Sequence, residues 1–296
     1  MNDATCTLCG NKHWVERNEK PIAWRSTFEK FSLFECTNCG VIKTFPEIKE
    51  SEIHDYYNFQ NYDSHAVTTK SESFFGFLYN QIRNINAYQK IKLLKRNIGN
   101  NKTFNLLDYG CGNGSFIDTA IRNSIHAEGV EFDEHLVKSL KNNGKIVYSV
   151  NEFYSLQKTF DVISLFHVFE HLQNPNFNLE VFRSKLKPNG LLVIALPNPD
   201  SYDCFYYSSE WAAWDVPIHY HHFRKDSIVQ FVESNGFDIL KIKPLYFDAF
   251  YISYLSEKIK KNKVPMFRGF LMGLYSNILA IKDGNYSSLL YVFKKN

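Results

Sequence analysis

Glycines at alternate positions, after a short apolar run and an acid, constrain this chain more than any other stretch. Residues 106–114 read LLDYGCGNG. The pattern predicts a strand, a tight turn and a helix that begins near Ser115. Glycine accepts a positive φ and lets another molecule approach the backbone, so three glycines in five residues predict a loop around a ligand. A Gly-rich turn in some other α/β protein is the alternative interpretation.

A second strand that ends in an acid strengthens the first interpretation. Residues 128–133 read EGVEFD, and Glu131 follows Asp108 by a little over twenty residues. In dinucleotide-type sheets an acid at this point binds ribose hydroxyls. Strands and helices alternate as far as residue 245, which predicts a parallel, doubly wound α/β sheet.

Four motifs between residues 104 and 245 carry a family resemblance. They are the D-x-G-x-G-x-G loop, HVFEHL at 167–172, LKPNGL at 186–191 and WDVPIHYHHF at 214–223. The chain resembles the small-molecule branch of the class I S-adenosylmethionine (SAM) methyltransferases. The resemblance implies a Rossmann-like seven-stranded sheet with an antiparallel last strand and a helical C-terminal cap insertion. Ile218 stands where these enzymes usually have an arginine, which puts in doubt any anionic group that the arginine would hold.

The resemblance also implies a set of cofactor-binding residues. The glycine loop faces the methionine part of SAM, the acid after the second strand faces the ribose, and the end of the third strand faces the adenine. An aromatic segment before the core covers the cofactor, with His65 as a further candidate. The predicted residues are Asp108, Gly110, Gly112, Gly114, Glu131, Phe132, Asn151, Glu152, Phe166, Tyr56 and Tyr62.

Methyl transfer needs a group that removes a proton from the acceptor, and histidine is the natural base near neutral pH. By its position in the matched motifs, His219 is the first candidate for the catalytic base and His167 the second. A hydrogen-bonded packing role is the alternative for either histidine. Some quinone-type O-methyltransferases hold a metal near Glu170 and His171, so a metal at this place is a further alternative.

Four of the six cysteines form two pairs with metal-ligand spacing. Cys6 and Cys9 form one CxxC knuckle and Cys36 and Cys39 the other, and a glycine follows each. The doubled spacing predicts one structural zinc ion with four thiolate ligands, and two disulfides are the alternative. Residues 1–50 carry seven Lys or Arg and seven Asp or Glu, which argues against a nucleic-acid partner.

The sequence therefore predicts three regions: a zinc ribbon over 1–45, an aromatic loop and linker helix over 46–100, and the methyltransferase domain over 101–296. The cap insertion lies at about 248–285. No export signal or membrane span is recognised, and we expect a cytoplasmic protein. The oligomeric state cannot be predicted.

We expect an enzyme that transfers a methyl group from SAM to a small molecule, with sugar C-methyltransferases as the nearest analogy. An rRNA methyltransferase with a zinc-ribbon recognition domain is one alternative. A catalytically silent SAM-binding scaffold is another.

Overall fold

The computed structural model describes residues 5–23, 30–49, 56, 74–99 and 103–296. The chain forms two compact units, each assembled from several segments. Unit 1 comprises 1–58, 167–179 and 195–291, and unit 2 comprises 59–166, 180–194 and 292–296. The domain boundaries predicted at residues 45 and 100 stay a prediction.

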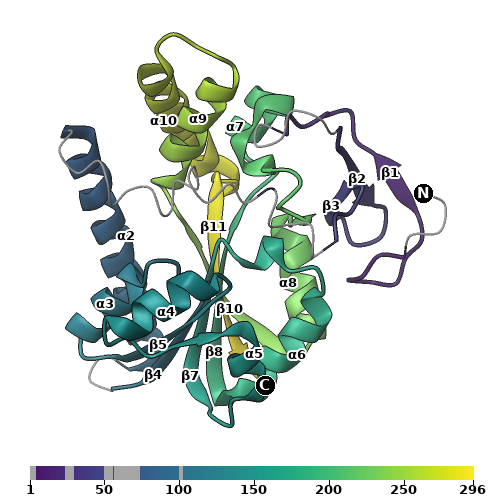
Figure 1. The fold of residues 1–296 in the computed structure, drawn as a ribbon. Coiled ribbons are helices and arrows are strands. Elements are labelled where there is room, and N and C mark those ends of the chain that lie inside the picture. Colours follow the sequence, from purple (N-terminus) through teal and green to yellow (C-terminus); the bar gives the residue numbers. More distant parts are fainter. Residues whose placement is uncertain (1–4, 24–29, 50–55, 57–73, 100–102) are drawn as a thin grey trace. The chain divides into compact units, whose positions relative to one another are not determined.

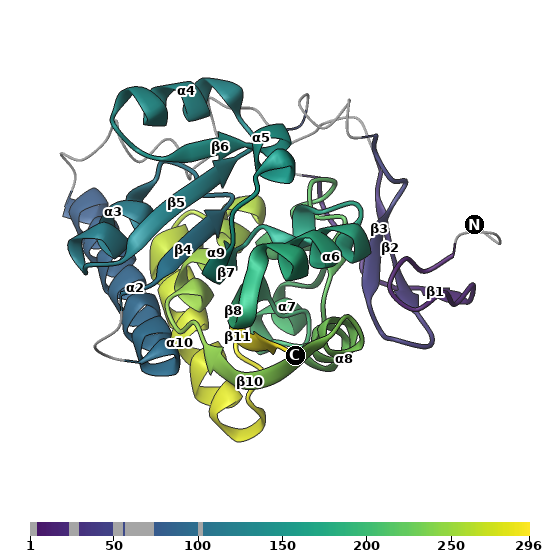
Figure 2. The ribbon, with the colours of Figure 1, turned by 90° about the horizontal axis from the view of Figure 1, so that it is seen from below.

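Unit 2 is built on parallel strands that alternate with helices. Its first four strands are β4 (Asn105–Tyr109), β5 (His126–Glu131), β6 (Val147–Ser149) and β7 (Phe160–Phe166). Strand β4 pairs with β5 on one side and β7 on the other, and β5 also pairs with β6. Figure 2 shows β5 between β4 and β6. The helices are α2 (Phe74–Ile98), α3 (Ser115–Arg122), α4 (Glu134–Asn142) and α5 (Val150–Ser155).

The complete sheet has seven strands in the order β10-β11-β8-β7-β4-β5-β6, and its last strand is antiparallel, as predicted. The remaining strands are β8 (Leu186–Pro197), β10 (Phe237–Pro244) and β11 (Ser288–Lys295). Strand β8 includes residues 187–190, although Pro, Asn and Gly in succession are typical of a turn. Asn189 has φ 61°, a left-handed conformation that asparagine tolerates, so one residue absorbs the bend within the strand. Strand β6 ends at Ser149 because α5 begins at Val150.

Side chains at the helix starts explain several boundaries. The Asp133 carboxylate accepts from the backbone N–H groups of His135 and Leu136 and caps α4. Helix α6 (Pro175–Lys185) begins at a proline, whose missing N–H costs nothing in the first turn. Helix α8 (Lys225–Ser234) has Arg224 at its N-cap, with no hydrogen bond from the cap side chain. Asp226 lies in the first turn, where its charge still favours the helix dipole.

Unit 1 contains a small antiparallel sheet with strands from both ends of the chain. Three strands come from the N-terminal segment (Figure 1), and the fourth comes from the histidine-rich segment after β8. They are β1 (Trp14–Glu16), β2 (Ser32–Cys36), β3 (Ile42–Phe45) and β9 (His221–His222). The register pairs Ile42 with His222 and Lys43 with His221. The histidine-rich segment is thus part of the sheet that carries the cysteines.

The core of unit 1 is aromatic. Trp211 and Trp214 pack edge to face at 5.0 Å between ring centroids, and both are buried with Tyr207 and Tyr220. Both indole N–H groups are satisfied, by the Asp203 carboxylate and the Ser208 carbonyl. The surrounding helices are η2 (Phe169–His171), α7 (Tyr202–Tyr207), η3 (Ser208–Glu210), η4 (Ala212–Trp214), α9 (Asp248–Ile259) and α10 (Pro265–Asp283).

The buried Asp203 carboxylate joins three segments of unit 1. It accepts hydrogen bonds from the indole N–H of Trp211 at 2.8 Å, the hydroxyl of Ser276 at 2.7 Å and the hydroxyl of Ser287 at 2.6 Å. Hydrogen bonds to a buried carboxylate are stronger than those between neutral groups. Asp203 therefore fixes α10 to α7 and to the tryptophan segment.

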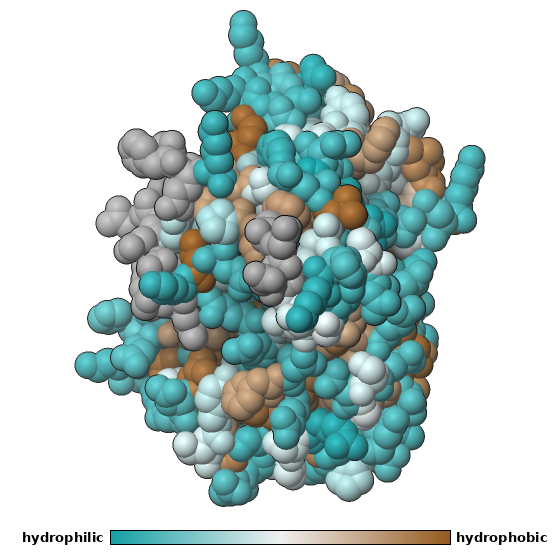
Figure 3. All heavy atoms as spheres, turned by 90° about the vertical axis from the view of Figure 1, so that its right-hand side faces the viewer, coloured by the Kyte–Doolittle hydropathy of each residue, from teal (hydrophilic) through white to brown (hydrophobic). Residues whose placement is uncertain are grey.

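Hydrophilic residues predominate on the face drawn in Figure 3, where hydrophobic ones are scattered among them. Among the helices that the structure describes, none is long and apolar enough to cross a membrane.

Candidate active site

The glycine loop of unit 2 has the left-handed backbone that its sequence predicts. Gly110, Gly112 and Gly114 have φ angles of 76°, 54° and 74°. The backbone N–H groups of Gly110 and Cys111 donate to the Val130 carbonyl of the next strand, which anchors the loop. A Cβ added to Gly112 would meet nothing within 4 Å, so glycine is needed there for backbone conformation and not for space.

The Glu131 carboxylate accepts hydrogen bonds from the glycine loop and from the turn after β5. One carboxylate oxygen accepts from the backbone N–H of Gly112 at 2.7 Å. The other oxygen accepts from the N–H groups of Phe132 at 2.8 Å and Asp133 at 3.2 Å. The predicted ribose ligand thus also ties the loop after β4 to the turn after β5.

Asp108 is buried at the end of β4, where the register places it beside Ser164 of β7. The Ser164 hydroxyl donates to its carboxylate at 2.7 Å. Burial raises the pKa of Asp108 to about 7, although the hydrogen bond from Ser164 and the charge of Lys90 act in the opposite direction. The carboxyl group is therefore poised to gain or lose its charge near neutral pH.

Two predicted aromatic ligands have defined neighbours in unit 2. The Phe132 ring is 47% exposed and packs edge-on against Tyr109 at 5.5 Å. The Phe166 ring lies 4.9 Å from Phe116, and the Lys90 ammonium is 3.7 Å from its centroid. These positions leave one face of Phe132 open to a ligand.

The predicted adenine ligands lie in α5. The Glu152 carboxylate completes a capping box with Ser149 and also binds the Lys141 ammonium at 2.8 Å. Asn151 is exposed in the first turn of the same helix. Tyr56 packs against the aromatic core of unit 1, and Tyr62 and His65 lie outside the described residues.

The first base candidate, His219, lies in a buried histidine cluster of unit 1. Its Nδ1 is 2.9 Å from the Ala213 carbonyl, and a carbonyl can only accept, so Nδ1 carries the proton. Among the described residues, none forms a hydrogen bond with its Nε2, the second nitrogen of the ring. The Thr44 hydroxyl of β3 donates to the His219 carbonyl at 2.7 Å, so the cysteine-bearing sheet fixes this residue.

His171 and Glu170 face His219. The two imidazole rings are 4.6 Å apart, and the Nδ1 of His171 donates to the Ile218 carbonyl at 3.0 Å. Burial and the neighbouring His219 lower the pKa of His171 to about 4, so it is neutral near pH 7. The buried Glu170 carboxylate has no hydrogen-bond partner among the described residues. One ligand atom from each of the three residues lies within 4.8 Å of the others, close enough to share a metal ion.

His167, the second base candidate, has a left-handed backbone with φ 56°, an uncommon conformation outside glycine. Its Nε2 lies 3.0 Å from the Asp248 carboxylate of α9, and its Nδ1 lies 3.7 Å from Glu170. Burial alone would lower the pKa of His167, but these two carboxylates outweigh it and raise the pKa to about 9. His167 is therefore protonated near neutral pH.

The four paired cysteines meet in one cluster, and the structure has them as free thiols. The sulfurs of Cys6 and Cys39 are 3.7 Å apart, and those of Cys9 and Cys36 are 3.6 Å apart. A tetrahedral zinc with Zn–S bonds of about 2.3 Å requires sulfurs about 3.8 Å apart. The four residues fit a zinc ion by chemistry and by spacing.

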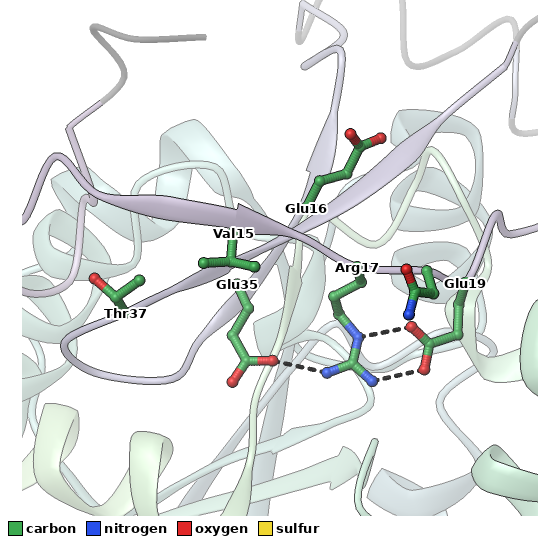
Figure 4. A pocket seen from close by; sticks show the side chains of 7 residues that line it. Val15, Glu16, Arg17, Glu19, Glu35 and Thr37 are labelled. Atoms are coloured by element: carbon green, nitrogen blue, oxygen red, sulfur yellow. Dashed lines mark hydrogen bonds and ion pairs between the residues drawn. The ribbon is translucent and has the colours of Figure 1, made fainter.

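A surface hollow of about 450 Å³ lies over β1 and β2 (Figure 4). Its central side chain, Arg17, donates to Glu19 and to Glu35, so its charge is already matched. The residues that line this hollow include no histidine or cysteine. Its three carboxylates are each paired with a cation, Glu19 and Glu35 with Arg17 and Glu16 with Lys20.

The sequence did not single out two residues of the candidate site. Asp248 was placed at the start of the cap insertion, and no motif links it to His167. Thr44 lies within the predicted N-terminal region, and nothing in its sequence context points to His219. Both contacts join residues far apart in the chain, and only the fold brings them together.

Comparison with known proteins gives a family and several relatives. A family model described as a methyltransferase domain matches residues 80–242, more than half of the chain. A malonyl-[acyl-carrier protein] O-methyltransferase of Halalkalibacterium halodurans is 29% identical over 154 residues, which are 47% of this chain and 56% of the relative. A ubiquinone biosynthesis O-methyltransferase of Rickettsia bellii is 24% identical over 62% of this chain and 82% of the relative. The chain thus spans little more than half of the first of these relatives.

Among solved structures, the magnesium protoporphyrin IX methyltransferase of Synechocystis with bound SAH is similar in fold. The TM-score is 0.54 over 84% of this chain and 100% of that chain, with 12% sequence identity. At this identity the similarity concerns the fold alone.

Proposed function

Because the chain belongs to this methyltransferase domain family and is a SAM-dependent methyltransferase, we propose that its acceptor is a small molecule, with a sugar as the first class to test. The single observation that carries the proposal is the buried His219, whose Nδ1–H donates to a carbonyl and whose Nε2 has no hydrogen-bond partner in the described part of the chain. The relatives named above are also methyltransferases, and the name of one of them refers to ubiquinone biosynthesis. The neutral charge balance of residues 1–50 supports the same choice over an RNA substrate.

The cofactor-binding role is assigned to residues of unit 2. We propose that the glycine loop and Glu131 hold SAM and that the open face of Phe132 contacts it. When bound, SAM supplies an electrophilic methyl group on a sulfonium. The pKa of Asp108 is raised to about 7, so its carboxyl group titrates near neutral pH. A positively charged ligand nearby lowers this pKa and favours the ionised form.

His219 is the proposed general base. Its Nε2 takes the proton from the acceptor atom as that atom bonds to the methyl carbon, and the Ala213 carbonyl stabilises the imidazolium that forms. His167 is the weaker candidate for this step, since the Asp248 and Glu170 carboxylates keep it protonated. We assign it an electrostatic role toward the acceptor.

The test compares His219→Ala with wild type and with His135→Ala, a control at an exposed histidine of α4. Labelled SAM is added to a host-cell extract, which is then separated into RNA, protein and small-molecule fractions. We expect label in the small-molecule fraction, at least tenfold less with His219→Ala, and unchanged S-adenosylhomocysteine affinity for both variants. Full transfer by His219→Ala would remove it as the base. Label in RNA would favour the rRNA alternative, and no label in any fraction would favour a silent binder.

The close approach of Glu170, His171 and His219 favours a second role for the same cluster, as a metal site. Both histidines donate Nδ1–H to backbone carbonyls, which fixes the orientation of each ring, as hydrogen bonds to metal-ligating histidines usually do. If this role holds, Glu170→Gln reduces the divalent metal bound per chain beyond the four-cysteine site. Unchanged metal content in that variant leaves His219 as a base.

We further propose that the four cysteines hold one structural zinc. All four tetrahedral positions are filled by protein, so no position is left for an activated water. The support is the sulfur spacing and the sheet that joins β3 to β9. Elemental analysis should find one zinc per chain, and Cys36→Ser should lose it. Metal-free protein with all four thiols intact and a folded module would contradict this assignment.

A further inference from the structure

Helix α10 is apolar on two opposite faces. Its first face carries four small residues, Gly269, Gly273, Ser276 and Ala280, and all are buried. Helix α9 covers this face, and Figure 1 shows the two helices side by side. A Cβ at Gly269 would lie 2.6 Å from the Tyr254 backbone, so glycine allows the close approach. The small-residue face of α10 is therefore packed against α9.

The second face of α10 carries bulky side chains that point to solvent. Phe267 is 64% exposed, Phe270 55% and Ile281 71%. At about 100° per residue, six such side chains fall within an arc of about 100°, and no polar residue of the helix falls in it. The six are Phe267, Phe270, Leu271, Leu274, Ile278 and Ile281. We call this set the α10 outer face.

The apolar surface continues onto α7. The Tyr275 ring packs edge-on against Tyr202 at 5.2 Å, and Tyr202 lies against Phe205, which is 80% exposed. A contiguous apolar surface of this kind on a folded protein marks a contact site for a partner or a membrane.

The charges beside the α10 outer face are mostly positive. Residues 258–283 contain six Lys or Arg and one acid, Asp283, which is the exposed last residue of α10. Lys258, Lys260, Lys261 and Lys263 are exposed at the turn between α9 and α10. The nearest preceding acid, Glu257, is buried and lies 3.7 Å from Arg268, so it leaves the lysines unmatched.

From this juxtaposition we infer that the α10 outer face lies on the surface of a bilayer that contains anionic lipids. Bulky apolar side chains enter the boundary of the acyl chains, and the turn lysines contact lipid phosphates. A second copy of the chain fits less well, since face-to-face docking would bring together two sets of four exposed turn lysines. The helix lies on the membrane and does not cross it. This inference does not rest on the identity of the acceptor.

The test uses sedimentation of the full chain with two kinds of vesicle. One contains equal parts of phosphatidylglycerol and phosphatidylcholine, and the other contains phosphatidylcholine alone. We expect binding to the anionic vesicles that weakens as salt is raised. Phe267→Ser with Phe270→Ser should weaken it at least tenfold, and Lys260→Glu with Lys263→Glu should abolish the preference for anionic lipid.

The matched control is Ile121→Ser with Leu240→Ser, which removes two exposed apolar side chains from α3 and β10. The control should bind vesicles like wild type, and every variant should keep its S-adenosylhomocysteine affinity, which reports correct folding. The inference is overturned if the chain binds neither vesicle, or if the α10 variants bind as tightly as the control. A vesicle-free dimer that the Phe267→Ser and Phe270→Ser changes dissociate would overturn it in favour of self-association.

Discussion

Replacing Glu131 by glutamine tests the link between the glycine loop and the cofactor. The carboxylate serves three backbone N–H groups, with Gly112 on one oxygen and Phe132 and Asp133 on the other. Glutamine has one acceptor oxygen, so its NH₂ group must face at least one of these donors. The variant keeps the size of the side chain. It loses the negative charge and the hydrogen bonds that one of the two carboxylate oxygens accepts.

The lost hydrogen bond at Gly112 is a charged one, at 2.7 Å. Such bonds contribute about 1.5–3 kcal/mol, and about 1.4 kcal/mol corresponds to a tenfold change in affinity. We therefore expect S-adenosylhomocysteine to bind roughly 10- to 100-fold more weakly to Glu131→Gln.

Isothermal titration calorimetry measures this change directly. Glu134→Gln is the control, because it makes the same chemical change at an exposed position of α4 three residues away. Equal affinities for the two variants would refute the argument that the carboxylate organises the cofactor loop. A fall in affinity for both would point to a general charge effect.

Three further predictions concern the same units. Gly112→Val forces a β-branched residue into positive φ, at a cost of about 1–3 kcal/mol, and should weaken S-adenosylhomocysteine binding at least tenfold; Gly144→Val, another positive-φ glycine, is the control. The folded-state pKa of Asp108 is raised to about 7, so this group's contribution makes stability fall as pH rises from about 4 to about 7. Asp108→Asn should therefore raise the melting temperature of the ligand-free protein more at about pH 8 than at about pH 5, and an equal gain at both pH values would contradict the assigned cause. Removal of zinc by a chelator should expose residues 5–49 to hydrogen exchange first. Methyl transfer should then fall while cofactor binding persists, because Thr44 of β3 fixes His219. Simultaneous loss of methyl transfer and cofactor binding would contradict this prediction.

The sequence was sufficient for the cofactor half of the fold because its signals are local. The glycine loop, the acid at the end of β5 and the helix start at Asp133 are set by residues a few positions apart, and the structure has them as expected. Where local signals compete, they do not decide the structure. The LKPNG segment has turn composition, yet it lies inside β8 because Asn189 absorbs the bend.

The histidine site could be predicted only in part. His167 and His219 were identified from motifs, and both roles stay predictions. Their protonation states depend on Asp248 and Ala213, which are distant in sequence or reached through the backbone. The pairing of β3 with β9 was equally out of reach, since it joins residues about 180 positions apart by backbone hydrogen bonds that leave no composition signal.

Asp203 has a consequence for how this chain can change over evolutionary time. It ties α10 to the body of unit 1 through Ser276 and Ser287, which lie outside the α10 outer face. Substitutions on that face leave the attachment untouched, whereas the Asp203 network tolerates little change because its partners are buried. Relatives can therefore differ in the residues of the α10 outer face while they keep the hydrogen bonds that attach α10 to unit 1.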